Sequence, residues 1–169
     1  MKRLIKAEAI FDRILTFFIW GAGVLLCFAI ISVSVDVILR FFFNIAQVWV
    51  LEIAEYILLF VVFLGAAWVQ KEEGHVKLDI LVDRLGMQTQ NIINVIVSIL
   101  GAITTFIYTW YGIVVVWKNY QEGLVAMTLL EPPNFLIIWV IPFGTFLLFI
   151  QFVRSTYKYI MHARHCQKN

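Results

Sequence analysis

The chain has 169 residues, of which 62% are hydrophobic and only 14% are charged, and its mean hydropathy is +0.90. A soluble domain is about half apolar and about a quarter charged, so this composition excludes an ordinary soluble domain and indicates an integral membrane protein. The formal net charge of +2 is too small to indicate nucleic-acid binding.

Four apolar stretches are long enough to cross a bilayer, because a spanning helix needs about 20 apolar residues. We expect membrane spans at about residues 14–35, 48–69, 92–117 and 135–153. The stretches are continuously apolar rather than alternating, which favours helices over a strand barrel. The predicted fold is therefore all-α, with a single four-helix membrane domain over residues 1–160 and a polar cytoplasmic tail at 161–169.

The distribution of lysine and arginine predicts the orientation of these spans. Basic residues gather before the first span, between the second and third, and after the fourth: Lys2, Arg3, Lys6, Arg13; Lys71, Lys77, Arg84; Arg154, Lys158, Arg164 and Lys168. Only Arg40 and Lys118 remain for the other side of the membrane. By the positive-inside rule, we expect both termini and the middle loop to be cytoplasmic.

The end of the first span carries Asp36 and Arg40, which are four residues apart. At this spacing in a helix the two side chains can form an ion pair. A second interpretation is that the Arg40 guanidinium binds a partner or a lipid phosphate. Trp49 and Trp68 lie near the ends of the second span, where tryptophan is typical of the membrane interface.

Glu52 and Glu55 interrupt the second span and lie on one face of the expected helix, close to its start. Three interpretations remain open for them. The carboxylates could be structural, because acidic groups favour the positive end of a helix. They could contact a neighbouring protein, or they could couple transport to an ion or a proton.

The middle loop contains a short amphipathic segment after Gly74 and His75. Its apolar residues fall on one helical face, which predicts a short helix in the lipid headgroup layer, with Lys77 and Arg84 beside the headgroups. The alternative is a surface that binds a partner. A lone loop histidine such as His75 is usually only solvated, so we expect no catalytic role for it.

The loop before the fourth span contains an apolar stretch, residues 124–130, that is too short to cross the membrane. Pro132 and Pro133 follow it and prevent a helix from continuing into the fourth span. We expect this stretch to rest at the outer interface.

No catalytic centre, metal site or cofactor site can be assembled from the polar residues. The sequence offers no serine, histidine and aspartate arrangement for nucleophilic catalysis. It also offers no glycine-rich phosphate loop and no metal-ligand cluster. The histidines, His75, His162 and His165, lie at or beyond the span ends, which argues against an intramembrane haem. We therefore predict a protein that is not an enzyme and has no cofactor.

Several separated motifs resemble the small membrane subunit of tripartite ATP-independent periplasmic (TRAP) transporters. In chain order they are Arg40-Phe41-Phe42-Phe43-Asn44 with Trp49 and Glu52, Phe63-Leu64-Gly65-Ala66-Ala67, Gly74-His75-Val76-Lys77-Leu78-Asp79, Pro132, and Pro142-Phe143-Gly144. The sequence departs from the family's Trp-x-Glu-Glu segment at one position, where Leu51 replaces the first acid.

The resemblance implies a non-catalytic subunit of the bacterial inner membrane. Such a subunit pairs with a large multi-span subunit that carries the substrate and sodium sites, and a periplasmic binding protein delivers the substrate. The imported solute would be an organic acid such as a dicarboxylate or sialic acid, and the small subunit would brace the scaffold of the large one. The residues that would serve assembly are Arg40, Trp49, Glu52, Glu55, Gly65, Gly74, His75, Asp79, Pro132 and Pro142.

Small residues provide possible helix-packing surfaces at Gly65-Ala66-Ala67 and at Gly101-Ala102. These surfaces could contact the partner subunit or pack within the chain's own helices. Two other functions are also considered. One is an independent homo-oligomeric transporter with Glu52 and Glu55 as coupling groups, and the other is a membrane anchor of a respiratory complex.

Overall fold

The computed structural model describes residues 2–45, 47–73, 87–128 and 130–166. Its helices are α1 (Lys2–Phe43), α2 (Val48–Glu73), α4 (Met87–Glu122), α5 (Asn134–Ile138) and α6 (Val140–Cys166). Within these ranges there is no strand, only one antiparallel bridge between Val125 and Pro133. Four described segments are long and apolar enough to cross a membrane: Ile10–Phe43, Val48–Glu72, Ile93–Glu122 and Asn134–Met161. The predicted all-α fold with four spans is confirmed.

Each predicted span lies within the described helices, but the helices continue past the spans. The 42 residues of α1 correspond to a length of about 63 Å, roughly twice the thickness of a bilayer core. Charged residues such as Arg13 and Asp36 lower the hydropathy without breaking the helix. The backbone of residues 161–166, predicted as a polar tail, continues α6. The predicted interfacial helix of the middle loop lies outside the described residues.

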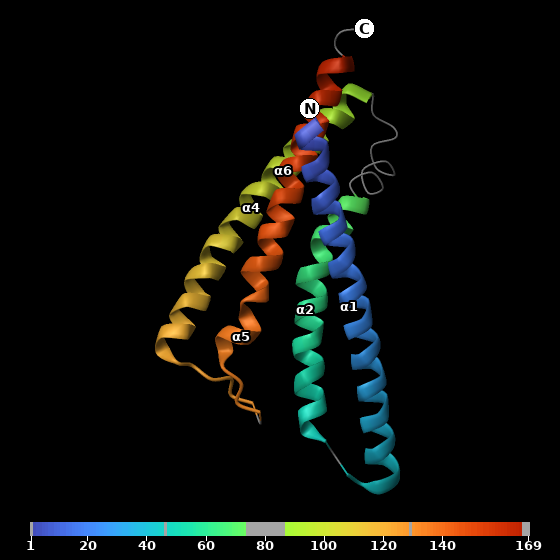
Figure 1. Ribbon diagram of the computed structural model, residues 1–169, viewed down its shortest axis with the longest axis vertical. Helices are drawn as coiled ribbons and strands as arrows, with labels where there is room; N and C mark the ends of the chain where they lie inside the picture. The colour runs from blue at the N-terminus through green and yellow to red at the C-terminus, as the bar shows by residue number, and fades with distance from the viewer. Residues whose placement is uncertain (1, 46, 74–86, 129, 167–169) are drawn as a thin grey trace.

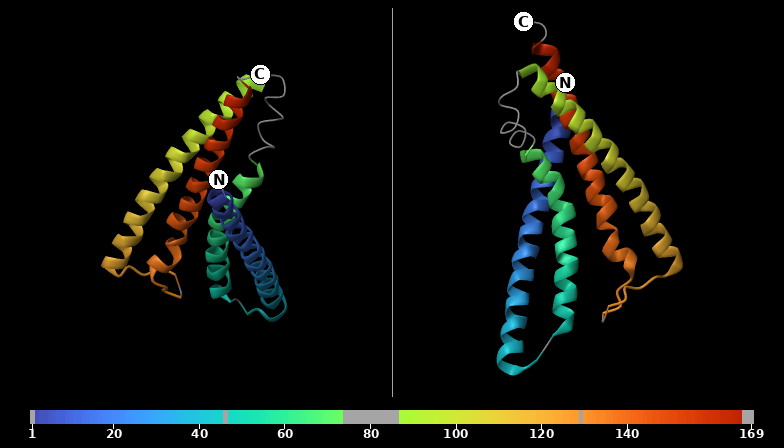
Figure 2. Two further views of the ribbon diagram at one scale, coloured as in Figure 1. Left: turned by 45° about the horizontal axis from the view of Figure 1, so that its top comes forward. Right: turned by 180° about the vertical axis from the view of Figure 1, so that it is seen from behind.

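Toward the end where α1 connects to α2, the long helices lie in one row, in the order α4, α6, α2 and α1, and toward the opposite end α1 crosses α2 and also meets α6 (Figure 1). Helix α6 packs against α4 on one side and α2 on the other, and α1 packs against α2. We call the end where α1 begins and α6 ends the terminal end, and the opposite end, where α1 connects to α2, the turn end. The helices converge toward the terminal end and spread apart toward the turn end (Figure 2).

The core lies toward the terminal end, where α1, α2 and α6 meet. Leu15, Ala67 and Leu147 each come from a different helix, and all three are buried. Phe18 and Phe143 pack against this cluster, edge to face, with their ring centroids 5.7 Å apart. Because lipid tails remove the hydrophobic force between helices, this close packing contributes directly to holding the three helices together.

The face of α1 that is turned inward repeats every seven residues. Leu15, Ala22, Ala29 and Asp36 are all 5% exposed or less. A seven-residue period keeps one face of a helix against a neighbour that crosses it at a shallow angle. The other faces of α1 are just as apolar, so hydropathy does not reveal this pattern. The small Ala22 and Ala29 are its sequence signal.

Helices α4 and α6 pack through small residues. A Cβ atom added at Gly101 would lie 2.6 Å from Cζ of Phe152, and one added at Gly112 would lie 3.1 Å from Cβ of Pro142. The predicted small surface at Gly101 is therefore used within the chain. Small residues allow such close approach between membrane helices.

A local break separates α5 from α6 at Trp139. Pro142 has no backbone N–H, so the carbonyl of Ile138 loses the donor that a continuous helix would supply. The flanking bonds persist, because Trp139 N–H donates to Phe135 at 3.2 Å and Phe143 N–H donates to Trp139 at 3.3 Å. The two helices consequently form one bent membrane segment, which begins directly after Pro133 as predicted.

Candidate functional site: polar contacts at the two ends of the helix row

Asp36 connects the last turns of α1 to the start of α2. The side chain of Arg40 donates to one carboxylate oxygen at 2.8 Å, and the backbone N–H of Gln47 donates to the other at 3.0 Å. The Asp36 side chain is only 3% exposed, whereas that of Arg40 is 49% exposed. The predicted ion pair is confirmed, and the Arg40 guanidinium also faces the surroundings of the protein.

The turn that follows α1 places several aromatic side chains at the surface. Asn44 adopts a left-handed backbone conformation with φ of 54°, which is a common way for a helix to end. Phe41, Phe42 and Phe43 precede it and are 82%, 72% and 65% exposed. Trp49, in the first turn of α2, is 46% exposed. The turn end of α1 and α2 is thus strongly apolar on the outside.

A hairpin joins α4 to α5 at the turn end. Gly123 ends α4 with φ of 59°, a conformation that suits glycine. The backbone N–H of Ala126 donates to Pro132 at 2.9 Å, and that of Asn134 donates to Leu124 at 3.0 Å. These two bonds close the loop that begins with the short apolar stretch.

Glu52 and Tyr56 of α2 hold this hairpin. The backbone N–H of Leu130 donates to the Glu52 carboxylate at 3.2 Å, and the hydroxyls of Tyr56 and Thr128 are 3.0 Å apart. Glu52 and Tyr56 are four residues apart, so both reach the same side of α2. The hairpin therefore ties α2 to the pair formed by α4 and α6.

Glu55 has different surroundings from Glu52, although the two are only three positions apart in the sequence. Its side chain is exposed, and it has no hydrogen bond or ion pair with any residue that the structure describes. The sequence gives the two glutamates the same set of possible roles, because they share one face of the helix. In the structure Glu52 has a contact within the chain, and Glu55 faces outward.

The remaining predicted residues lie at several places. Gly65 is buried, and a Cβ atom there would lie 3.6 Å from Cδ1 of Ile19, an ordinary contact. Trp68 packs at the edge of the core, Pro132 lies in the hairpin, and Pro142 contacts Gly112. Outside the described residues lie Gly74, His75, Lys77, Asp79 and Arg84.

A charged cluster at the terminal end was not predicted. One Asp12 carboxylate oxygen accepts a hydrogen bond from Arg154 at 2.7 Å, and the other lies 3.9 Å from Lys71 Nζ. The Arg154 guanidinium also lies 5.4 Å from the centre of the Phe11 ring. This cluster joins α1, α2 and α6. Its one sequence signal is an acid that stands among the basic residues of the predicted cytoplasmic side.

Two further contacts between helices were also missed. The hydroxyl of Thr109 on α4 donates to that of Thr145 on α6 at 3.1 Å. A Cβ atom added at Gly144 would lie 2.7 Å from Cβ of Phe63 on α2. Both contacts depend on which helices become neighbours, and neither residue pair is close in sequence.

The chain matches a known family over most of this architecture. Residues 29–160 match the family described as "Tripartite ATP-independent periplasmic transporters, DctQ component". The matched region includes the pair of Asp36 and Arg40 and the hairpin with Glu52. It also includes the second half of the first span and the other three spans. No curated protein matches the chain.

Proposed function

This chain belongs to the DctQ family and is a small membrane component of a tripartite ATP-independent periplasmic transporter, and we propose that it braces the large transport subunit without transporting solute itself. The family match covers more than half of the chain. The bracing role is our interpretation of how the four helices are arranged.

The observation that carries this proposal is the single row of long helices. A row leaves two broad faces open along its length, whereas a closed bundle would hide most of its apolar surface. Large exposed side chains are found along all four long helices, among them Phe17, Val62, Trp110 and Val153. Such a layer leaves enough apolar surface open to contact both a larger membrane protein and lipid.

Several of the polar groups described in and near the spans hold this layer together. Asp36 and Glu52 accept backbone hydrogen bonds within the chain, and Thr109 donates to Thr145. Groups that are already engaged in helix contacts are poorly placed to bind and release a cation, which needs several converging oxygens. This supports a structural role for Glu52 over a role in ion coupling.

The finer function that we propose follows the family. The complete transporter would import an organic acid such as a dicarboxylate or sialic acid together with sodium. The substrate and sodium sites would lie in the large subunit, and a periplasmic binding protein would deliver the solute. We propose the bacterial inner membrane as its location, with the terminal end in the cytoplasm, because the basic residues concentrate there.

We propose that exposed residues of the turn end make contacts outside the chain. Arg40 and Trp49 would meet the headgroup layer or the large subunit, and Glu55 would meet a polar group of the partner. Glu52 and Gly65 would act indirectly, by fixing the hairpin and the packing of α2 on α1. Roles in assembly for Gly74, His75 and Asp79 remain predictions.

The test is to purify the tagged chain from native membranes in mild detergent and to identify the retained proteins by mass spectrometry. We expect a much larger multi-span protein in a constant ratio, absent from untagged membranes. Recovery of the chain only with itself would contradict the proposal and favour an independent transporter. A haem absorbance band in the purified complex would instead favour a respiratory anchor.

The variants Glu55→Gln and Glu52→Gln, compared in the same purification, distinguish the roles of the two carboxylates. We expect Glu52→Gln to weaken the hairpin while the partner is still recovered, and Glu55→Gln to reduce recovery. If Glu55→Gln abolishes transport by the assembled complex without reducing recovery, the contact role for Glu55 is wrong and ion coupling is favoured.

A further inference from the structure

Helices α1 and α4 form the two edges of the row (Figure 1), and they expose different chemistry. On α4, Tyr108 and Tyr111 are 62% and 66% exposed. The two tyrosines are three positions apart, so their rings lie on one side of the helix. Thr104, one turn before Tyr108, is also exposed. This hydroxyl-bearing face lies beside the face that packs on α6 through Gly101 and Thr109.

Tyr108 lies near the middle of its span, and Tyr111 lies about one turn closer to the turn end. The membrane-crossing segment of α4 runs from Ile93 to Glu122, so Tyr108 is about 22 Å from each end of it. Tyrosine in membrane proteins concentrates at the interfaces, a position that Trp117 and Tyr120 occupy on the same helix. Because Tyr108 lies about 14 Å along the helix from Trp117, its rigid ring cannot bring its hydroxyl to that interface.

Neither hydroxyl has a hydrogen bond to a residue within the described ranges. Lipid tails offer no donor or acceptor, and an unpaired hydroxyl in an apolar medium is energetically unfavourable. The exposed hydroxyls of α1 show the usual solution. Thr16 and Ser34 donate to carbonyls of their own helix at 2.8 and 2.7 Å. A tyrosine hydroxyl stands too far from its own backbone to do this.

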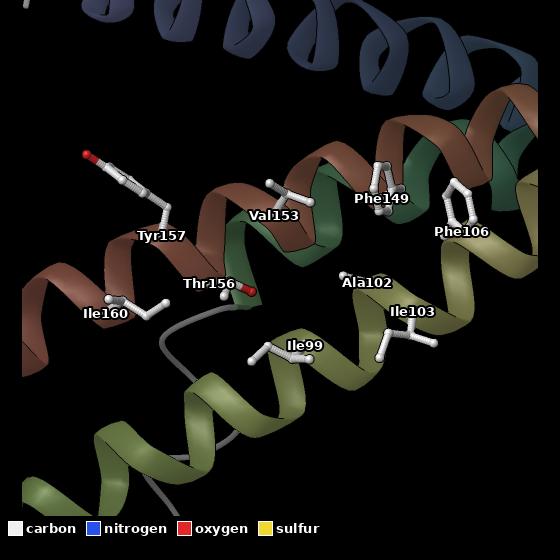
Figure 3. Close-up of a pocket in the computed structure, with 9 residues that line it drawn as sticks. All are labelled: Ile99, Ala102, Ile103, Phe106, Phe149, Val153, Thr156, Tyr157 and Ile160. Carbon is white, nitrogen blue, oxygen red and sulfur yellow. The ribbon is translucent and has the colours of Figure 1, made fainter.

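Other open surfaces of the row suit lipid. The outer face of α1 carries apolar side chains such as Phe17, Val24 and Phe28. A groove of about 450 Å³ between α4 and α6 is lined by Phe106, Phe149 and other mainly apolar side chains (Figure 3). The Thr156 hydroxyl at this groove donates to its own helix at 2.9 Å, and the Tyr157 ring points away from α4. Acyl chains can cover the apolar side chains of these surfaces.

We propose that the face of α4 with Tyr108 and Tyr111 packs against a transmembrane helix of the large transport subunit, which forms hydrogen bonds with both hydroxyls. The partner is a protein helix because only protein supplies hydrogen-bonding groups in the middle of the bilayer. The inference rests on the proposed function and extends it by assigning the edge of the row at which the subunits meet.

Site-specific photocrosslinking in native membranes tests this assignment. A photoreactive phenylalanine analogue replaces Tyr111, and in a matched control it replaces Phe28 on the lipid-facing edge. We expect Tyr111 to give an adduct with a large multi-span protein and Phe28 to give none. An adduct from Phe28 but not from Tyr111, or an adduct of Tyr111 with a second copy of this chain, would overturn the proposal.

The double variant Tyr108→Phe/Tyr111→Phe tests the hydrogen bonds themselves. We expect recovery of the large subunit to fall about threefold to tenfold for each hydroxyl removed, as for hydrogen bonds between membrane helices. Phe17→Leu/Phe28→Leu should leave recovery unchanged. Unchanged recovery for the tyrosine variant would contradict the proposal. If the wild-type chain retains no multi-span protein, the proposed function itself is wrong, so the two failures can be distinguished.

Discussion

Asp12 is a single carboxylate that contacts basic groups from two other helices. Its partners differ in burial, because the Arg154 side chain is 16% exposed and that of Lys71 is 28% exposed. An arginine with so little access to water depends on its acidic partner more than a surface arginine does. Asp12 itself is 36% exposed, so solvent screens part of the attraction.

We expect Asp12→Asn to lower the free energy of unfolding by about 1 kcal/mol, because the guanidinium of Arg154 would lose its charged partner. The measurement is thermal unfolding of the purified protein in detergent. Glu122→Gln is the matched control, since its pair with Lys118 spans 3.8 Å between side chains that are 47% and 70% exposed. Equal effects of the two substitutions would show that the cluster of Asp12 has no special importance.

Residues close in sequence were predicted well, and residues brought together by the fold were not. The pair of Asp36 and Arg40 follows from helical spacing alone. The contact between Glu52 and Leu130 joins residues 78 positions apart, and the bond between Arg154 and Asp12 joins residues 142 positions apart. No local pattern identifies such partners, because many polar residues at each end of the spans could have paired.

At the scale of helices, the spans could be predicted but their order in the row could not. Hydropathy identifies each span because lipid requires about 20 apolar residues. The order of neighbours depends on which faces allow close approach, and every face of these helices is apolar. Small residues such as Ala22 and Gly144 determine the contacts, and they are visible only as isolated small residues in the sequence.

We expect Gly144→Ala to destabilise the protein by about 1–3 kcal/mol, as for overpacking in a close-packed core. The added methyl group would meet Phe63, including its backbone carbonyl carbon at 2.8 Å, so α6 and α2 would have to separate. Thermal unfolding in detergent measures the change. Gly21→Ala is the matched control, because nothing lies within 4 Å of its added Cβ, and it should not destabilise. An unchanged unfolding temperature for Gly144→Ala would mean that α2 and α6 do not pack this closely.

At the scale of the whole molecule, an even number of spans places the start of α1 and the end of α6 at the same end of the row (Figure 1). The hairpin between α4 and α5 lies at the opposite end. Its Met127 is 105% exposed, the highest value among the large apolar side chains that the structure describes. The predicted orientation therefore places Met127 outside the cytoplasm.

We expect a cysteine at Met127, in a chain that also carries Cys27→Ser and Cys166→Ser, to react with a membrane-impermeant maleimide in spheroplasts. The native Cys166, tested with Cys27→Ser alone, should react only after the membrane is opened, because it ends α6 on the predicted cytoplasmic side. Labelling of Cys166 in closed spheroplasts, with Met127→Cys protected, would show that the orientation is reversed.

The spreading of the helices toward the turn end has a consequence for the bilayer itself (Figure 2). A protein whose helices diverge occupies more area in one leaflet than in the other, so each inserted copy displaces unequal numbers of lipids from the two monolayers. In the predicted orientation the larger footprint lies in the periplasmic monolayer. Without a partner of the opposite taper, such a shape favours curvature of the membrane, and a complementary subunit would restore a flat bilayer.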